Sequence, residues 1–124
     1  MVRGIGIDLI EKDRFVRLHQ KYGKRLAHKI LSSDERDELD KIADKPSFLS
    51  KRFAAKEALS KAIGTGLYRQ GIYPSLITIK HDQYGKPFFK FDHSLITYME
   101  RNFVNIQLSI TDSDDESIAF VITE

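Results

Sequence analysis

The sequence of 124 residues contains no cysteine, which excludes disulfides, cysteine-based zinc sites and thiol nucleophiles. It has no run of about 18 apolar residues, so it predicts no membrane-spanning helix. Asp8 interrupts the first apolar stretch too early for a secretory signal peptide. The Walker A, Rossmann, Gly-x-Ser-x-Gly and His-Glu-x-x-His motifs are also missing. These absences are compatible with a reducing compartment, and we expect a cytoplasmic protein.

The composition is typical of one globular domain. Hydrophobic residues make up 41% of the chain and charged residues 31%, compared with about 45–50% and 25% in average domains. A chain of this length can bury one substantial core. We therefore expect a single soluble domain over residues 1–124.

Charge is segregated along the chain, although the net charge is only +2. Residues 11–30 contain seven Lys or Arg and two acidic residues, whereas residues 32–44 contain six acidic and two basic residues. A nucleic-acid-binding surface would be more uniformly basic and would carry interleaved aromatic residues. The basic segment predicts one local acidic partner, with a nucleic-acid-binding module as an alternative hypothesis.

Hydrophobic periodicity predicts an α+β domain. Alternating or continuous apolar runs predict strands over residues 2–10, 76–80, 87–91, 106–111 and 118–122. The last of these strands is expected to be buried on both faces. Helical spacing predicts helices over residues 11–22, 25–31, 33–43, 48–63 and 93–102. Ser32 and Glu35 form a capping-box pattern, Ser47 is the expected cap of the long helix, and Gly64 its expected end.

The first strand places Gly4, Gly6 and Asp8 on one face. The two glycines leave this face bare, so that a ligand or another backbone can approach it closely. Asp8 has two interpretations from its position alone. It can cap the helix that follows, or it can hold a ligand on the bare face.

The predicted helix 48–63 departs from simple amphipathic patterning because two cations, Arg52 and Lys56, fall inside its apolar arc. Their long side chains either reach water past the core or bind an anion such as phosphate. Glu57 and Lys61 are one turn apart and can form an ordinary ion pair. If Asp8 approaches Glu57, the two carboxylates instead suit a magnesium–phosphate site.

Four segments together resemble the holo-acyl-carrier-protein synthases, which are short 4′-phosphopantetheinyl transferases. They are GIGIDLIEKDRF (4–15), FLSKRFAAKEALSKAIGTG (48–66), DQYGKP (82–87) and LSITD (108–112). The resemblance implies an antiparallel-rich sheet packed on a long helix, in a homotrimer with active sites between subunits. It also implies transfer of phosphopantetheine from coenzyme A to a serine of an acidic apo acyl carrier protein, with Mg²⁺.

The resemblance assigns roles by motif position. Asp8 and Glu57 would be the magnesium ligands, and Lys61 would contact the coenzyme A pyrophosphate. Arg52, supported by Lys56, would contact the 3′-phosphate. The remaining nucleotide-lining residues would be Gly64, Thr65, Gly66, Gly85, Lys86 and Pro87.

The basic stripe of the first helix would dock the carrier protein. Arg14 matches the docking arginine of the family, and Arg17, Lys21 and Lys24 are added as basic residues of the same face. Glu57 is the first candidate for the general base, with Asp34 or Glu35 left open.

Two positions depart from the family pattern, because Gln107 and Asp112 stand where many members have histidine. These departures keep a third hypothesis open, in which the chain is a catalytically inactive trimeric scaffold.

Overall fold

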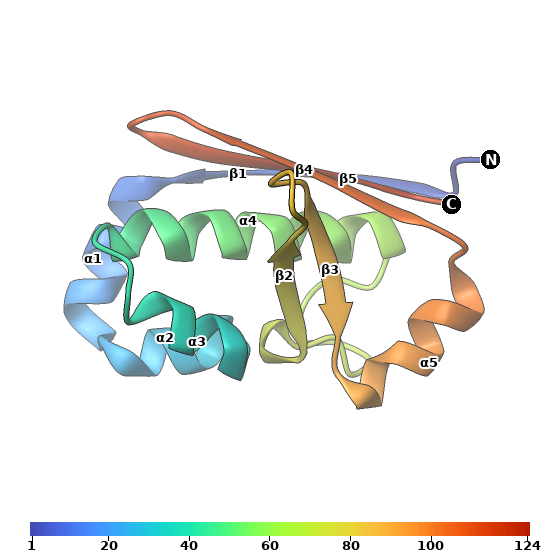
Figure 1. Cartoon of the computed structure of the whole chain (residues 1–124), viewed down its shortest axis with the longest axis horizontal. Helices are drawn as coiled ribbons and strands as arrows, with labels where there is room; N and C mark the ends of the chain where they lie inside the picture. The colour runs from blue at the N-terminus through green and yellow to red at the C-terminus, as the bar shows by residue number, and fades with distance from the viewer.

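The computed structural model describes all 124 residues (Figure 1). The elements in chain order are β1 (Gly4–Glu11), α1 (Lys12–Tyr22), α2 (Lys24–Ile30), α3 (Ser33–Leu39), α4 (Lys45–Ile63), a 3-10 turn η1 (Pro74–Leu76), β2 (Ile77–His81), β3 (Pro87–Phe91), α5 (His93–Asn102), β4 (Ile106–Asp112) and β5 (Glu116–Thr123).

Two antiparallel sheets flank the long helix α4. Strands β1, β5 and β4 form a three-stranded sheet in that order, and β2 and β3 form a separate hairpin. Figure 1 shows the three-stranded sheet lying along α4, with α1, α2 and α3 at one end of the molecule and α5 at the other. The predicted α+β class and the antiparallel sheet on a long helix are confirmed.

Glycines in β1 let this strand lie directly against α4. A Cβ atom at Gly4 would overlap the carbonyl oxygen of Ala62, and one at Gly6 would overlap that of Ala58. The expected close approach to the bare face is therefore confirmed, and the approaching backbone is that of α4. Asp8 lies on the same face, which brings its carboxylate beside the helix.

Helix α4 begins three residues earlier than predicted. Its cap is Asp44, whose Oδ1 accepts the backbone N–H of Ser47 at 3.1 Å. Ser47 as the cap was wrong, because Pro46 occupies the first turn, where a missing N–H costs no hydrogen bond. Gly64 ends the helix in the left-handed conformation, with a φ of 87°, as predicted.

The outer face of the three-stranded sheet is apolar and uncovered. Ile5 is 64% exposed, Ile7 59% and Leu9 51%, and the neighbouring Phe120 of β5 is 38% exposed. Burial of β5 on both faces was therefore wrong for the single chain, because only the α4 side is covered. We call this surface, made by Ile5, Ile7, Leu9 and Phe120, the apolar sheet face. None of the helices is both long and apolar enough to cross a membrane.

Candidate active site

Asp8 and Lys61 form an ion pair at the junction of β1 and α4. Lys61 Nζ lies 3.2 Å from Asp8 Oδ1 and donates a second hydrogen bond to the Ile7 carbonyl at 2.9 Å. The other carboxylate oxygen, Asp8 Oδ2, is buried and has no hydrogen-bond partner. Asp8 does not cap α1, whose cap position is Glu11. One acidic oxygen thus remains available to a ligand.

Glu57 lies on α4 within reach of the Asp8 charge. Burial raises the pKa of Glu57, and repulsion from Asp8 raises it further, while Lys61 and Arg14 act in the opposite direction. Lys61 forms its ion pair with Asp8 and none with Glu57. The structure therefore brings together two carboxylates and two cations, and it replaces the ordinary Glu57–Lys61 pair with an Asp8–Lys61 pair.

This donor set fits a magnesium ion. Magnesium is held by one or two carboxylates, with substrate phosphates and water completing its shell. The unpartnered Asp8 Oδ2 and the raised pKa of Glu57 both indicate negative charge that a cation would relieve. The chain offers no cluster of three or more acidic, histidine or cysteine ligands, so the protein itself would supply only these two.

Lys56 points into the core instead of toward a ligand. Its side chain is fully buried, and Nζ lies 2.5 Å from Glu35 Oε1 while donating to the carbonyls of Ile30 at 2.8 Å and Pro74 at 2.9 Å. These contacts use all three of its N–H donors. Both interpretations of Lys56, as a side chain that reaches water and as a phosphate ligand, were wrong because a buried carboxylate is its partner.

Glu35 is the centre of this buried network. It completes the predicted capping box with Ser32, and its Oε2 accepts the N–H of Ile79 at 3.0 Å. Glu35 is only 1% exposed, so the hypothesis that it is the general base was wrong. Asp34 pairs instead with Lys80 at the surface, at 3.3 Å.

Arg52 belongs to the same network. Its Nε lies 3.5 Å from Glu35 Oε2, and its Nη2 lies 3.5 Å from Glu38 Oε1. The guanidinium also stacks over the ring of Phe48, 4.4 Å from the centroid. A contact with the coenzyme A 3′-phosphate stays a prediction, and it requires Arg52 to share its guanidinium with these internal partners.

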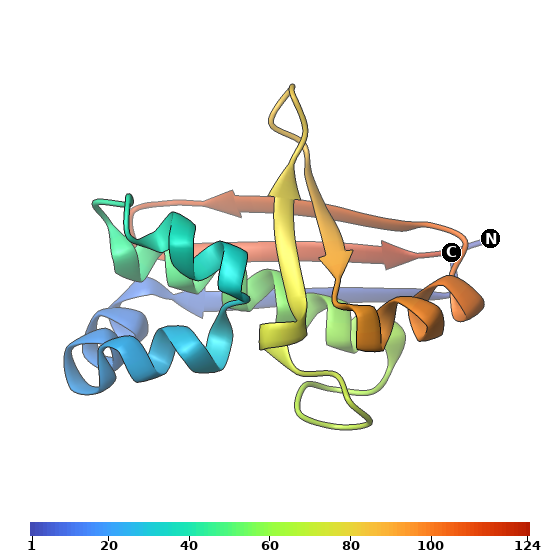
Figure 2. The same ribbon diagram turned by 60° about the horizontal axis from the view of Figure 1, so that its bottom comes forward.

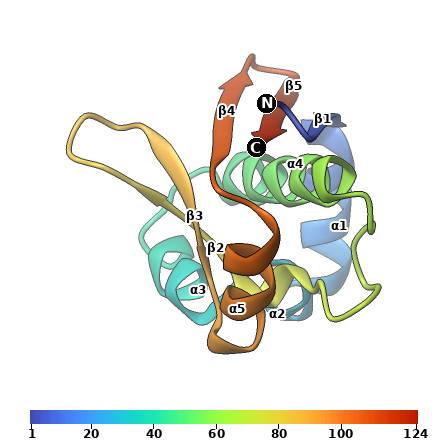
Figure 3. The same ribbon diagram turned by 90° about the vertical axis from the view of Figure 1, so that its right-hand side faces the viewer.

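The two predicted nucleotide-lining loops lie apart within one chain. Gly64, Thr65 and Gly66 follow the end of α4, whereas Gly85 and Lys86 form the tip of the β2–β3 hairpin. Figures 2 and 3 both show this tip projecting from the body, on the side away from the loop after α4. At Pro87 the chain turns back into β3. The two loops therefore lie on opposite sides of the single chain.

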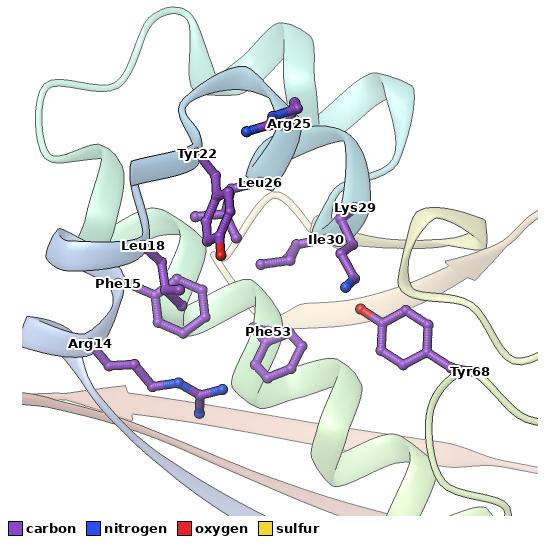
Figure 4. A pocket seen from close by; sticks show the side chains of 10 residues that line it. All are labelled: Arg14, Phe15, Leu18, Tyr22, Arg25, Leu26, Lys29, Ile30, Phe53 and Tyr68. Carbon is purple, nitrogen blue, oxygen red and sulfur yellow. The ribbon is translucent and has the colours of Figure 1, made fainter. Parts of the chain in front are cut away.

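A groove of about 550 Å³ lies between α1, α2 and α4 (Figure 4). Its apolar walls are Phe15, Leu18, Tyr22, Leu26, Ile30, Phe53 and Tyr68, and its cations are Arg14, Arg25 and Lys29. None of these three cations forms an ion pair. We call this feature the basic groove.

The basic groove contains one of the four residues that were predicted to dock the carrier. Arg14 lines it, whereas Arg17, Lys21 and Lys24 do not. The sequence reasoning missed Arg25 and Lys29, although their spacing of four residues places them on one face of α2. Arg14 also acts on the charge of Glu57, so one end of the groove lies close to the two carboxylates.

Comparison with known proteins identifies the family. Residues 4–121 match the profile of the 4′-phosphopantetheinyl transferase superfamily. The chain is 46% identical, over 100% of its length and 99% of the relative's, to a holo-[acyl-carrier-protein] synthase of Nitrosospira multiformis. The crystal structure of the Neisseria meningitidis synthase matches with a TM-score of 0.94 and 38% identity, covering 100% of this chain and 99% of that chain.

A further structure shows a bound nucleotide in this fold. The Bacillus anthracis synthase, solved in complex with CoA (3′,5′-ADP), has a TM-score of 0.83 and 32% identity, covering 100% of this chain and 97% of that chain. The chain belongs to the 4′-phosphopantetheinyl transferase superfamily. Within that superfamily it is a transferase of the holo-[acyl-carrier-protein] synthase type.

Proposed function

We propose that this protein transfers 4′-phosphopantetheine from coenzyme A to a serine of an apo acyl carrier protein, with magnesium bound by Asp8 and Glu57. The observation that carries the proposal is the convergence of Asp8, Glu57 and Lys61 at one place, with Asp8 Oδ2 left unpartnered. The same convergence argues against an inactive scaffold, because the repulsion between Asp8 and Glu57 opposes folding when no cation relieves it.

The geometry suggests how the chain would act. The serine oxygen attacks the β-phosphorus of coenzyme A, the bond to the departing adenosine 3′,5′-bisphosphate breaks, and the serine proton must be accepted. Bound magnesium would neutralise charge on the phosphates. Lys61 would hold a pyrophosphate oxygen with its ammonium group. Glu57 is our candidate for accepting the proton, because it lies at the same place as Asp8 and Lys61.

We propose that the active protein is a homotrimer. The apolar sheet face exposes large side chains that a single chain leaves in water. The two nucleotide-lining loops lie apart within one chain, so a complete site needs loops from two copies. Lys86 Nζ donates to Gln107 Oε1 at 3.0 Å, which joins the hairpin to β4 of the three-stranded sheet. Gln107 thus accepts from a cationic side chain, that of Lys86, in the single chain.

We propose that the acidic carrier protein docks in the basic groove. Arg14, Arg25 and Lys29 are unpaired and surround an apolar floor, which suits a helix that carries both carboxylates and an apolar side chain. Its position next to Glu57 would bring a docked carrier to the reacting phosphate. A cytoplasmic location remains a prediction that follows from this reaction.

Calorimetry of coenzyme A binding tests the metal assignment. Wild-type protein should bind coenzyme A more tightly with magnesium than with chelator, and Asp8→Asn and Glu57→Gln should lose this difference. Asp37→Asn removes an exposed, unpaired carboxylate of α3 and should behave as wild type. Magnesium-dependent binding that survives in Asp8→Asn would remove Asp8 from the metal site.

Sedimentation equilibrium tests the trimer. Ile7→Lys places a charge on the apolar sheet face and should give monomers, whereas Val104→Lys, at a position 97% exposed, should leave the trimer intact. A wild-type protein that stays monomeric at micromolar concentration would contradict the proposed assembly.

A further inference from the structure

Tyr68 has a backbone conformation that its side chain disfavours. Five residues of the loop after α4 have positive φ, and three of them are glycines. The other two residues with positive φ are Tyr68, at 65°, and Gln70, at 53°. A bulky residue in this region is an outlier, and such outliers cluster at functional sites when the surrounding structure fixes them.

The loop backbone fixes this conformation through hydrogen bonds of its own. The N–H of Tyr68 donates to the Ile72 carbonyl at 2.7 Å, and the N–H of Ile72 donates to the Arg69 carbonyl at 2.9 Å. The Tyr68 side chain contributes little to the core, because the residue is 42% exposed. Core packing therefore does not explain why a tyrosine occupies a position suited to glycine.

The side chain of Tyr68 forms a wall of the basic groove. Figure 4 shows Tyr68 and Lys29 pointing toward one another across the groove, with Phe53 beside them on α4. Lys29 Nζ lies 5.6 Å from the Tyr68 ring centroid. Phe53 is one helical turn before Glu57, whose charge acts on the Tyr68 hydroxyl. Tyr68 thus contacts the groove and lies within reach of the Glu57 charge.

We propose that Tyr68 is a specificity-determining residue for the carrier protein, whose ring contacts the carrier segment next to the acceptor serine. The proposal rests on the function proposed above, in which a carrier in the basic groove delivers its serine to the site of Asp8 and Glu57. Tyr68 lines the groove and also lies within reach of the Glu57 charge. The ring offers apolar contact there, and its hydroxyl offers a hydrogen-bond donor.

Steady-state kinetics with three variants test this role. Tyr68→Gly suits the loop backbone, so it should fold with a Tm within about 2 °C of wild type. It should raise the KM for the carrier about tenfold, which corresponds to the loss of one good contact. Its kcat and its KM for coenzyme A should stay within about twofold of wild type. Tyr68→Phe, which keeps the ring, should recover most of the carrier KM. Tyr98→Ala, an exposed tyrosine on α5, is the matched control and should change none of these.

Each outcome has a distinct meaning. An unchanged carrier KM in Tyr68→Gly would overturn the role of Tyr68 while leaving the proposed function intact. A rise confined to the KM for coenzyme A would place Tyr68 against that substrate and would equally overturn the proposal. Failure of the wild-type protein to modify any carrier would reject the proposed function and, with it, this role.

Discussion

The substitution Lys56→Met should destabilise the protein strongly, because it removes the nearest cation from a buried carboxylate, that of Glu35. Lys56 and Glu35 are both fully buried, 2.5 Å apart. Removing one member of a buried ion pair typically costs about 3–5 kcal/mol. The carbonyls of Ile30 and Pro74 lose their donor as well. Arg52 still lies 3.5 Å from the same carboxylate and offsets part of this loss, so we expect a decrease of about 4 kcal/mol in the free energy of unfolding.

The pH dependence of stability gives this prediction a second signature. Burial lowers the pKa of Lys56 from 10.5 to about 8. The unfolded chain therefore binds this proton more tightly than the folded protein between those values, and Lys56 makes stability rise as the pH increases from about 8 to 10.5. The Lys56→Met variant should lack this rise.

A double-mutant cycle measured by urea unfolding at pH 7 isolates the pair. The double variant Lys56→Met/Glu35→Gln lacks both charges. The amide oxygen of the new glutamine can still accept the hydrogen bond from the Ile79 N–H. We expect the double variant to lose about 2 kcal/mol less than the sum of the single losses. Lys51→Met, which removes a partly exposed lysine of the same helix, should cost less than about 1 kcal/mol. Strictly additive losses would refute the argument, because they would show that the two buried side chains are not coupled.

Three other predictions concern the sheet, the carboxylates and the groove. Gly6→Ala should lower the Tm or prevent folding, because its Cβ would overlap a carbonyl oxygen of α4; thermal unfolding checks this, and an unchanged Tm would contradict it. Glu57→Gln should abolish transfer yet raise the Tm at pH 7. The raised pKa means that ionised Glu57 opposes folding, so the gain should disappear below the ordinary pKa of 4.5; a loss of stability at pH 7 would contradict the sign. Arg25→Ala and Lys29→Ala should each raise the KM for the carrier several-fold and weaken its dependence on salt; kinetics at two ionic strengths measure this, and an unaltered salt dependence would argue against docking in the groove.

Local patterns in the sequence were sufficient to predict most of the fold. Alternating or continuous apolar runs located all five strands, and the capping box at Ser32 marked the start of α3. The bare glycine face of β1 correctly indicated a close backbone approach. These features depend on neighbours within a few residues, which a single sequence displays directly.

Interactions between distant segments could not be predicted. The pairing of Lys56 with Glu35 joins α4 to α3, and nothing in the spacing of 21 residues distinguishes it from a solvent-exposed pair. The basic groove combines Arg14 of α1 with Lys29 of α2, and the stripe predicted on α1 does not show that the two helices meet there. Exposure of the apolar sheet face was missed because an apolar strand pattern does not show which chain covers it.

Intact-protein mass spectrometry of an apo acyl carrier protein, incubated with this protein, coenzyme A and magnesium, tests the proposed reaction most directly. We expect the carrier to gain about 340 Da, the mass of one phosphopantetheine group, and to lose this gain when chelator removes the metal. Asp8→Asn and Glu57→Gln should give no gain, while Asp37→Asn should match wild type. An unmodified carrier across fatty-acid and polyketide types, or full modification by Asp8→Asn, would contradict the account.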